Sequence, residues 1–185
     1  MISDVPPVVS DGSGDVNGLR GGVTEAAHVG DERTALTGFL QRQRDLVAWK
    51  VRAASGETLR SVSTPSGLSV HGVVRHLENV ERYWFREAFA GEDGLRYDWT
   101  DEDGDAEWRV PVDVDMGTLL AAYAEETSRC DAVIEAASSL DDVSASRGFS
   151  LRWIIIHLIE ETARHLGHLD LLRELADGEV GEEPA

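Results

Sequence analysis

Residues 151–175 read LRWIIIHLIEETARHLGHLDLLREL, and this stretch decides the predicted fold. Leucine and isoleucine occupy nearly every face of the helix that it would form, which is typical of a helix buried among other elements. Ser150 is a suitable residue to cap its first turn, and Asp177-Gly178 follows its expected end. Because such a helix needs other helices to cover its apolar surface, the sequence predicts a helical domain.

Three further stretches carry apolar side chains at helical spacing, at about residues 31–54, 69–90 and 116–138. Ser69 is a suitable N-cap for the second of them. We find no convincing alternation of apolar and polar residues that would indicate a strand. Four helices joined by short or medium links predict an all-α four-helix bundle.

The bundle is expected to span residues 30–178. Residues 1–29 are rich in glycine, serine, valine, aspartate and proline and show no sustained periodicity. We expect them to form a disordered leader, because they cannot bury enough apolar surface to offset the entropy lost on ordering. Residues 179–185 form an acidic tail, for which we expect the same behaviour.

Between the second and third helices, residues 91–115 form an irregular acidic insertion with the sequence GEDGLRYDWTDEDGDAEWRVPVDVD. Trp99 and Trp108 stand isolated among its carboxylates. Loops of this length in compact domains are often functional, so the tryptophans could wall a pocket. The alternative is that the insertion covers an open edge of the bundle.

The composition excludes several classes of function. A formal net charge of -18 argues against a nucleic-acid binder and against docking on anionic lipid, because both need basic patches. No apolar run reaches the roughly 18 residues of a membrane span. The first residues lack the features of a secretory signal, so we expect a cytoplasmic protein. Cys130 is the only cysteine, so no intrachain disulfide can form.

The side chains suited to metal binding or catalysis are concentrated on the last predicted helix. At about 100° per residue, His157, Glu161, His165 and His168 lie within an arc of about 80°. Glu161 and His165 are four residues apart, so their side chains meet one turn apart. A carboxylate and imidazoles on a buried helix need partners, and a divalent cation is an efficient one. Zinc is the favoured ion, with nickel, iron and manganese as alternatives.

A third ligand is expected from another helix, and His76 is the best candidate because it lies at the edge of the apolar stripe of the second helix. His71 falls far round that helix, and His28 lies in the leader. Glu161 and His165 could instead form a simple ion pair. For His157 and His168, a supporting polar role is favoured over ligation.

The segments HGVVRHLENVERYWF (71–85) and SLRWIIIHLIEETARHLGHLDLLREL (150–175), with the acidic insertion between them, resemble the DinB-like four-helix superfamily. They are most similar to its actinobacterial branch of unknown function, which includes the mini-circle proteins. The resemblance covers about residues 31–178 and implies an up-down-down-up bundle with a metal site at one end.

In that superfamily the ligands are one residue on the second helix and a pair four residues apart on the last. The matching positions here are His76, Glu161 and His165. Glu161 departs from the commoner three-histidine set, and it resembles the His/Glu/His site of the mycothiol-dependent maleylpyruvate isomerase. His168 stands where many relatives have glutamine, which leaves its role open.

The resemblance implies a metal-dependent enzyme that uses a low-molecular-weight thiol such as mycothiol to transfer to, or isomerise, a small electrophile. Under this hypothesis His168 or His157 assists as a base next to the metal ligands. The alternative is a non-catalytic bundle that binds a small molecule or a partner, with a structural His/Glu cluster. A third interpretation is a homodimeric interaction protein that uses exposed tryptophans.

Overall fold

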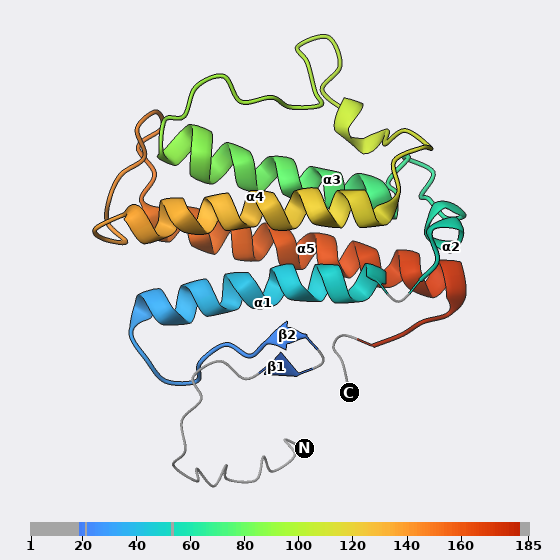
Figure 1. Cartoon of the computed structure of the whole chain (residues 1–185), viewed down its shortest axis with the longest axis horizontal. Coiled ribbons are helices and arrows are strands. Elements are labelled where there is room, and N and C mark those ends of the chain that lie inside the picture. Colours follow the sequence, from blue (N-terminus) through green and yellow to red (C-terminus); the bar gives the residue numbers. More distant parts are fainter. Residues whose placement is uncertain (1–18, 21, 53, 182–185) are drawn as a thin grey trace, which may run out of the picture.

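A computed structural model of the chain describes residues 19–20, 22–52 and 54–181. In this part of the chain four long helical segments lie side by side (Figure 1). The segments are α1 (Glu32–Arg52), α3 (Val70–Glu81) continued by the π-helix η1 (Arg82–Phe89), α4 (Met116–Ala136) and α5 (Leu151–Asp177). The predicted all-α class is confirmed.

The long helices pack mainly as two pairs, α1 with α5 and α3 with α4. In Figure 1, α1 and α5 run in one direction, and α3 and α4 run in the opposite direction. A short helix, α2 (Gly56–Arg60), lies between α1 and α3, and the insertion holds one 3-10 turn, η2 (Ala106–Trp108). None of the helices described is long and apolar enough to cross a membrane.

Local side-chain chemistry sets the helix ends. The Ser69 and Ser150 hydroxyls accept hydrogen bonds from backbone N–H groups three residues on, which satisfies donors that a first turn leaves unpaired. Asp115 does the same for α4, over 2.8 Å. At the other end of α5, Gly178 adopts a left-handed conformation with φ 77°, which glycine accepts without strain.

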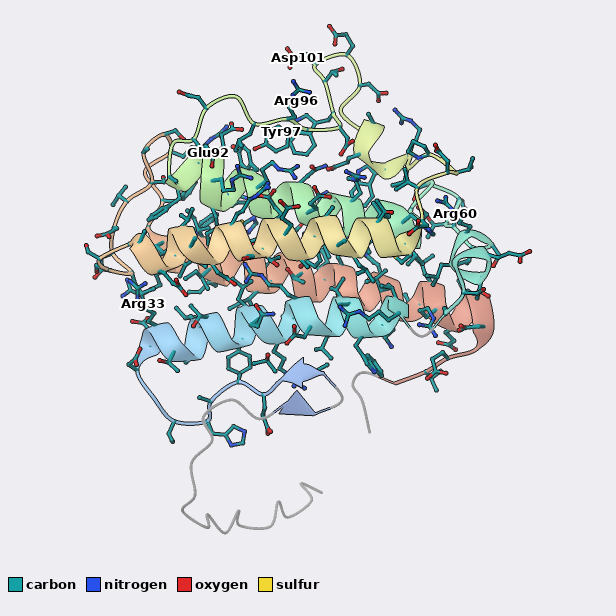
Figure 2. All side chains as sticks on the ribbon, viewed as in Figure 1. Arg33, Arg60, Glu92, Arg96, Tyr97 and Asp101 are labelled. Atoms are coloured by element: carbon teal, nitrogen blue, oxygen red, sulfur yellow. The ribbon has the colours of Figure 1, made fainter. Side chains whose placement is uncertain are left out.

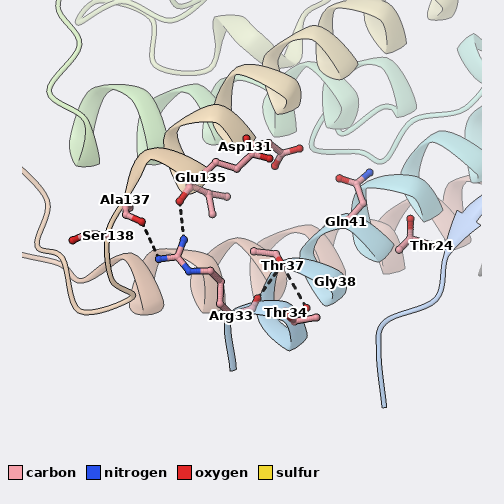
Figure 3. A pocket seen from close by; sticks show the side chains of 11 residues that line it. Thr24, Arg33, Thr34, Thr37, Gly38, Gln41, Asp131, Glu135, Ala137 and Ser138 are labelled. Carbon is pink, nitrogen blue, oxygen red and sulfur yellow. Dashed lines mark hydrogen bonds between the residues drawn. The ribbon is translucent and has the colours of Figure 1, made fainter. Parts of the chain in front are cut away.

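The far end of α4 is held by a side chain from α1. The Arg33 guanidinium donates to the carbonyl oxygens of Ile134 and Ala137, over 2.8 and 3.1 Å (Figure 3). These carbonyls lie at the end of the helix, where the regular hydrogen bonds of the helix stop, although the Ala137 N–H also donates to Ile134 over 3.3 Å. Arg33 therefore spans a groove of polar side chains that separates the start of α1 from the end of α4.

Part of the expected leader, residues 1–18, lies outside the described residues, as do residues 182–185 of the expected tail. Part of the remaining leader packs against α1. Strands β1 (Leu19–Arg20) and β2 (Val23–Thr24) pair in antiparallel fashion beside α1, and Val23 is buried in the core. Buried side chains thus occur before the expected boundary at residue 30, at Val23 and Ala26, because two isolated apolar residues form no periodic pattern in the sequence.

The insertion is tied down on η1. Figure 2 shows Glu92 and Tyr97 on the stretch of chain that runs over this helix. The Arg86 guanidinium donates to Glu92, and the Tyr97 hydroxyl donates to Glu87, each over 2.8 Å. These two contacts hold the first part of the insertion against η1.

Ion pairs are buried between the helices. Glu81 of α3 is 1% exposed and accepts two hydrogen bonds of 2.7 Å from Arg44 of α1, which also contacts Asp131 of α4 over 2.7 Å. On η1, Arg82 and Arg86 both donate to Glu126 of α4, which is also buried. A buried charge is costly unless it is paired, so these contacts constrain how the helices are positioned relative to one another.

His71 of α3 is buried and neutral. Its side chain is 3% exposed, and its Nε2 atom has no hydrogen-bond partner among the described residues. Burial, together with the nearby charge of Arg60, lowers the pKa of His71 from 6.5 to about 4. His71 therefore belongs to the packing of the fold; the sequence had set it aside as a ligand but had not predicted its burial.

We expect Arg44→Met to lower the free energy of unfolding by about 3–5 kcal/mol, because it leaves the Glu81 carboxylate buried without its partner. The double variant Arg44→Met/Glu81→Leu should recover most of this loss, since it removes both buried charges. Urea unfolding of the three proteins measures the difference. A double variant no more stable than the single one would contradict this account of the pair.

We expect the free energy of unfolding to fall as the pH decreases from 6.5 to about 4, because the folded state binds a proton at His71 less readily than the unfolded chain does. The stability that comes from neutral His71 is complete above pH 6.5 and is lost toward pH 4. His71→Leu should show a smaller fall over this range in urea unfolding. An unchanged pH dependence in the variant would be the contradicting result.

Candidate metal centre

Three side chains predicted as metal ligands meet between α3 and α5. Nε2 of His76 lies 3.2 Å from Oε1 of Glu161, and Nε2 of His165 lies 3.2 Å from the same oxygen. The three donor atoms all lie within 4.8 Å of one another. The structure therefore brings together the trio that the sequence singled out, with His76 on one helix and the other two on its neighbour.

The separations fit a small divalent cation. Zinc bonds to histidine nitrogen and carboxylate oxygen at about 2.0–2.2 Å, so adjacent ligands of a tetrahedral site lie about 3.3 Å apart. Both contacts to Glu161 have nearly this length. Two imidazoles and one carboxylate would leave a fourth position for an exogenous ligand.

The hydrogen bonding of His76 also favours a cation. Its Nδ1 atom lies 2.8 Å from Oε1 of Glu107, and a carboxylate can only accept, so Nδ1 carries a hydrogen. In a neutral ring Nε2 then presents a lone pair to Glu161. Two acceptors 3.2 Å apart require a proton or a cation between them. The donor set therefore fits a metal ion.

The protonation states of the two α5 residues suit ligation. Burial lowers the pKa of His165 from 6.5 to about 4, so its ring is neutral at pH 7. Burial opposes ionisation of Glu161, but hydrogen bonding to His76 lowers its pKa overall. A neutral imidazole and an ionised carboxylate are the forms that bind metals.

The two other α5 histidines have different surroundings. Nδ1 of His168 lies 3.3 Å from Nδ1 of His165, so His168 contacts the ring of a candidate ligand on the side away from Glu161. His157 stacks on Trp153, with ring centroids 5.1 Å apart, and meets the edge of Trp84. The structure thus brings His168 to the trio and records no contact between His157 and the trio.

The insertion contributes Trp108, which the sequence analysis considered as a pocket wall, and Glu107, which it did not assign to the site. Trp108 stacks on the ring of His76, with centroids 4.4 Å apart, whereas Trp99 stacks on Tyr97 instead. Glu107 contacts His76 and also accepts a hydrogen bond of 2.9 Å from Asn79. The only sequence signal for Glu107 was its place beside Trp108, because one carboxylate among many in an acidic loop forms no pattern.

Comparison with known proteins identifies the family of the chain. None of the curated proteins matches the chain. The family model of mycothiol-S-transferase matches residues 35–178, which is well over half of the chain and includes all three candidate ligands. The predicted resemblance to the DinB-like superfamily and to its mycothiol-dependent members is confirmed. The chain belongs to the mycothiol-S-transferase family, which is DinB-like.

Proposed function

We propose that this protein is a metal-dependent S-transferase that joins mycothiol to a small electrophile. The observation that carries the proposal is the convergence of His76 and His165 on one carboxylate oxygen of Glu161, in a chain of this family. Zinc is the proposed ion because a set of two histidines and one carboxylate is common for it. When bound, the metal lowers the pKa of a coordinated thiol and so supplies thiolate at neutral pH.

The nucleophilic thiol has to come from a small molecule. Cys130 is the only cysteine of the chain, and its side chain is 0% exposed. Burial raises the pKa of its thiol far above the ordinary value. A buried, protonated thiol is a poor nucleophile, so a thiol cofactor fits the chemistry better than a protein nucleophile.

His168 is the proposed acceptor of the thiol proton. Its Nδ1 atom contacts His165, and its Nε2 atom has no recorded partner among the described residues. In the reaction the thiol sulfur forms a bond to the electrophilic carbon, and the leaving group departs with its bonding electrons. Proton transfer from the thiol to Nε2 of His168 balances this step. His157 is the weaker candidate because its ring lies in an aromatic stack.

The helices and the insertion have matching roles in this proposal. We interpret the four long helices as the up-down-down-up bundle of DinB-like proteins, with the ligands on the facing sides of α3 and α5. The stacking of Trp108 on His76 supports a role for residues 91–115 as one wall of the site. Such a wall would exclude water from the site.

We expect protein purified without a polyhistidine tag to contain about one equivalent of divalent metal, and His165→Ala to lose it, because the variant removes one of three ligands. Transfer of mycothiol to chlorodinitrobenzene should fall more than about 100-fold in the same variant. Elemental analysis and the absorbance of the product provide the two measurements. His28→Ala is the matched control, since His28 is exposed and far from the trio in sequence.

Metal content that is the same in His165→Ala and in the control would contradict the proposed ligand set. A metal-free wild type whose melting temperature falls in Glu161→Gln and does not respond to added zinc would favour the alternative, a structural His/Glu cluster in a non-catalytic bundle.

A further inference from the structure

The nitrogen of His76 that faces away from the trio has a partner of its own, Glu107 of the insertion. Nδ1 of His76 donates to Oε1 of Glu107 over 2.8 Å, and Nε2 points to Glu161 over 3.2 Å. The two nitrogens of one ring are thus engaged from opposite sides. A ring held in this way can turn only by breaking the bond to Glu107.

One face of α3 is shaped to receive the turn that carries Glu107. Gly72, His76 and Asn79 follow one another at spacings of four and three residues, so they lie in one row on the helix. A Cβ atom at Gly72 would lie 2.8 Å from the backbone oxygen of Trp108, so only glycine lets the turn approach this closely. His76 and Asn79 then each bond one oxygen of Glu107.

The buried carboxylate of Glu107 faces the ring of His76. Glu107 is 6% exposed, and its only ion-pair partner among the described residues is the ring of His76. A buried carboxylate without an opposite charge is costly. A cation held at Nε2 of His76 would polarise the ring and strengthen its Nδ1–H bond to the carboxylate.

We propose that Glu107 is a positioning residue for the metal centre, holding His76 in the tautomer and orientation that present Nε2 to the metal. The proposal rests on the function proposed above, which supplies the metal. It assigns a function to the acidic insertion, because the turn at residues 105–108 would then complete the site from outside the bundle. Asn79 assists by holding the second carboxylate oxygen.

Zinc titration of the full-length, metal-free protein against a chromophoric chelator tests this role. We expect Glu107→Ala to weaken zinc binding about 10–100-fold, which is the usual effect of removing a carboxylate behind a histidine ligand. Glu107→Gln should lose less, because its amide oxygen can still accept from Nδ1. Glu102→Gln is the matched control, since Glu102 is an exposed carboxylate of the same insertion. Its affinity should equal that of the wild type.

A second measurement follows the ring itself. In the ¹⁵N-labelled, metal-free protein we expect a hydrogen-bonded, slowly exchanging proton on Nδ1 of His76 in the wild type and in Glu107→Gln. This proton should exchange rapidly in Glu107→Ala. A general loss of structure would disturb the other histidine signals as well, whereas loss of positioning changes that of His76.

The outcomes separate the two proposals. A wild type that binds zinc, with Glu107→Ala binding equally well, would overturn the role of Glu107 and leave the metal-dependent function intact. A wild type that binds no zinc would overturn the metal-dependent function, and the positioning of a metal ligand with it. Absence of a protected proton on Nδ1 of wild-type His76 would overturn the positioning role whatever the zinc affinity. If Glu107→Ala does not fold, the zinc affinity of Glu107→Gln is the test. An affinity equal to that of Glu102→Gln would contradict the proposal.

Discussion

Glu81 lies in the interior between three helices, and its carboxylate is held by the guanidinium of Arg44 in two hydrogen bonds of 2.7 Å. The need to pair such buried charges governs much of the structure. Apolar contacts between helices are nearly interchangeable, so by themselves they permit small shifts along the helix axes. A bidentate ion pair resists such shifts, because moving one helix by a turn would leave a buried charge unpaired. The pairs that Glu126 makes with Arg82 and Arg86 restrict α4 in the same way.

The candidate metal centre obeys the same requirement with a different set of groups. Glu161 is mostly buried, and the groups around it are the imidazoles of His76 and His165, together with Arg164 at the surface. Imidazoles balance a carboxylate only when protonated, and burial keeps His165 neutral. A divalent cation satisfies all three side chains at once. Structural pairing and the proposed chemistry thus arise from the same cause, which is the cost of unpaired buried polar groups.

Much of the fold could be predicted from the sequence, because helices leave a periodic pattern. The bounds of α1, α4 and α5 differ from those expected by only a few residues, and the caps at Ser69 and Ser150 are present as predicted. The π-helical turns of η1 were not predicted, since a π-helix is a rare variant of the α-helix. The burial of Val23 was missed because one residue makes no period.

The sequence by itself determined which side chains share a face of α5, since residues four apart on a helix meet whatever surrounds them. It also placed His76 toward the core, through the apolar stripe of its helix. Only the tertiary structure decided what those faces meet. His157 and His168 lie on the same side of α5, yet one enters an aromatic stack and the other contacts His165, because different parts of the chain pack there. The pairing of Glu107 with His76 spans 31 residues of sequence and an irregular loop, and no local rule encodes such a contact.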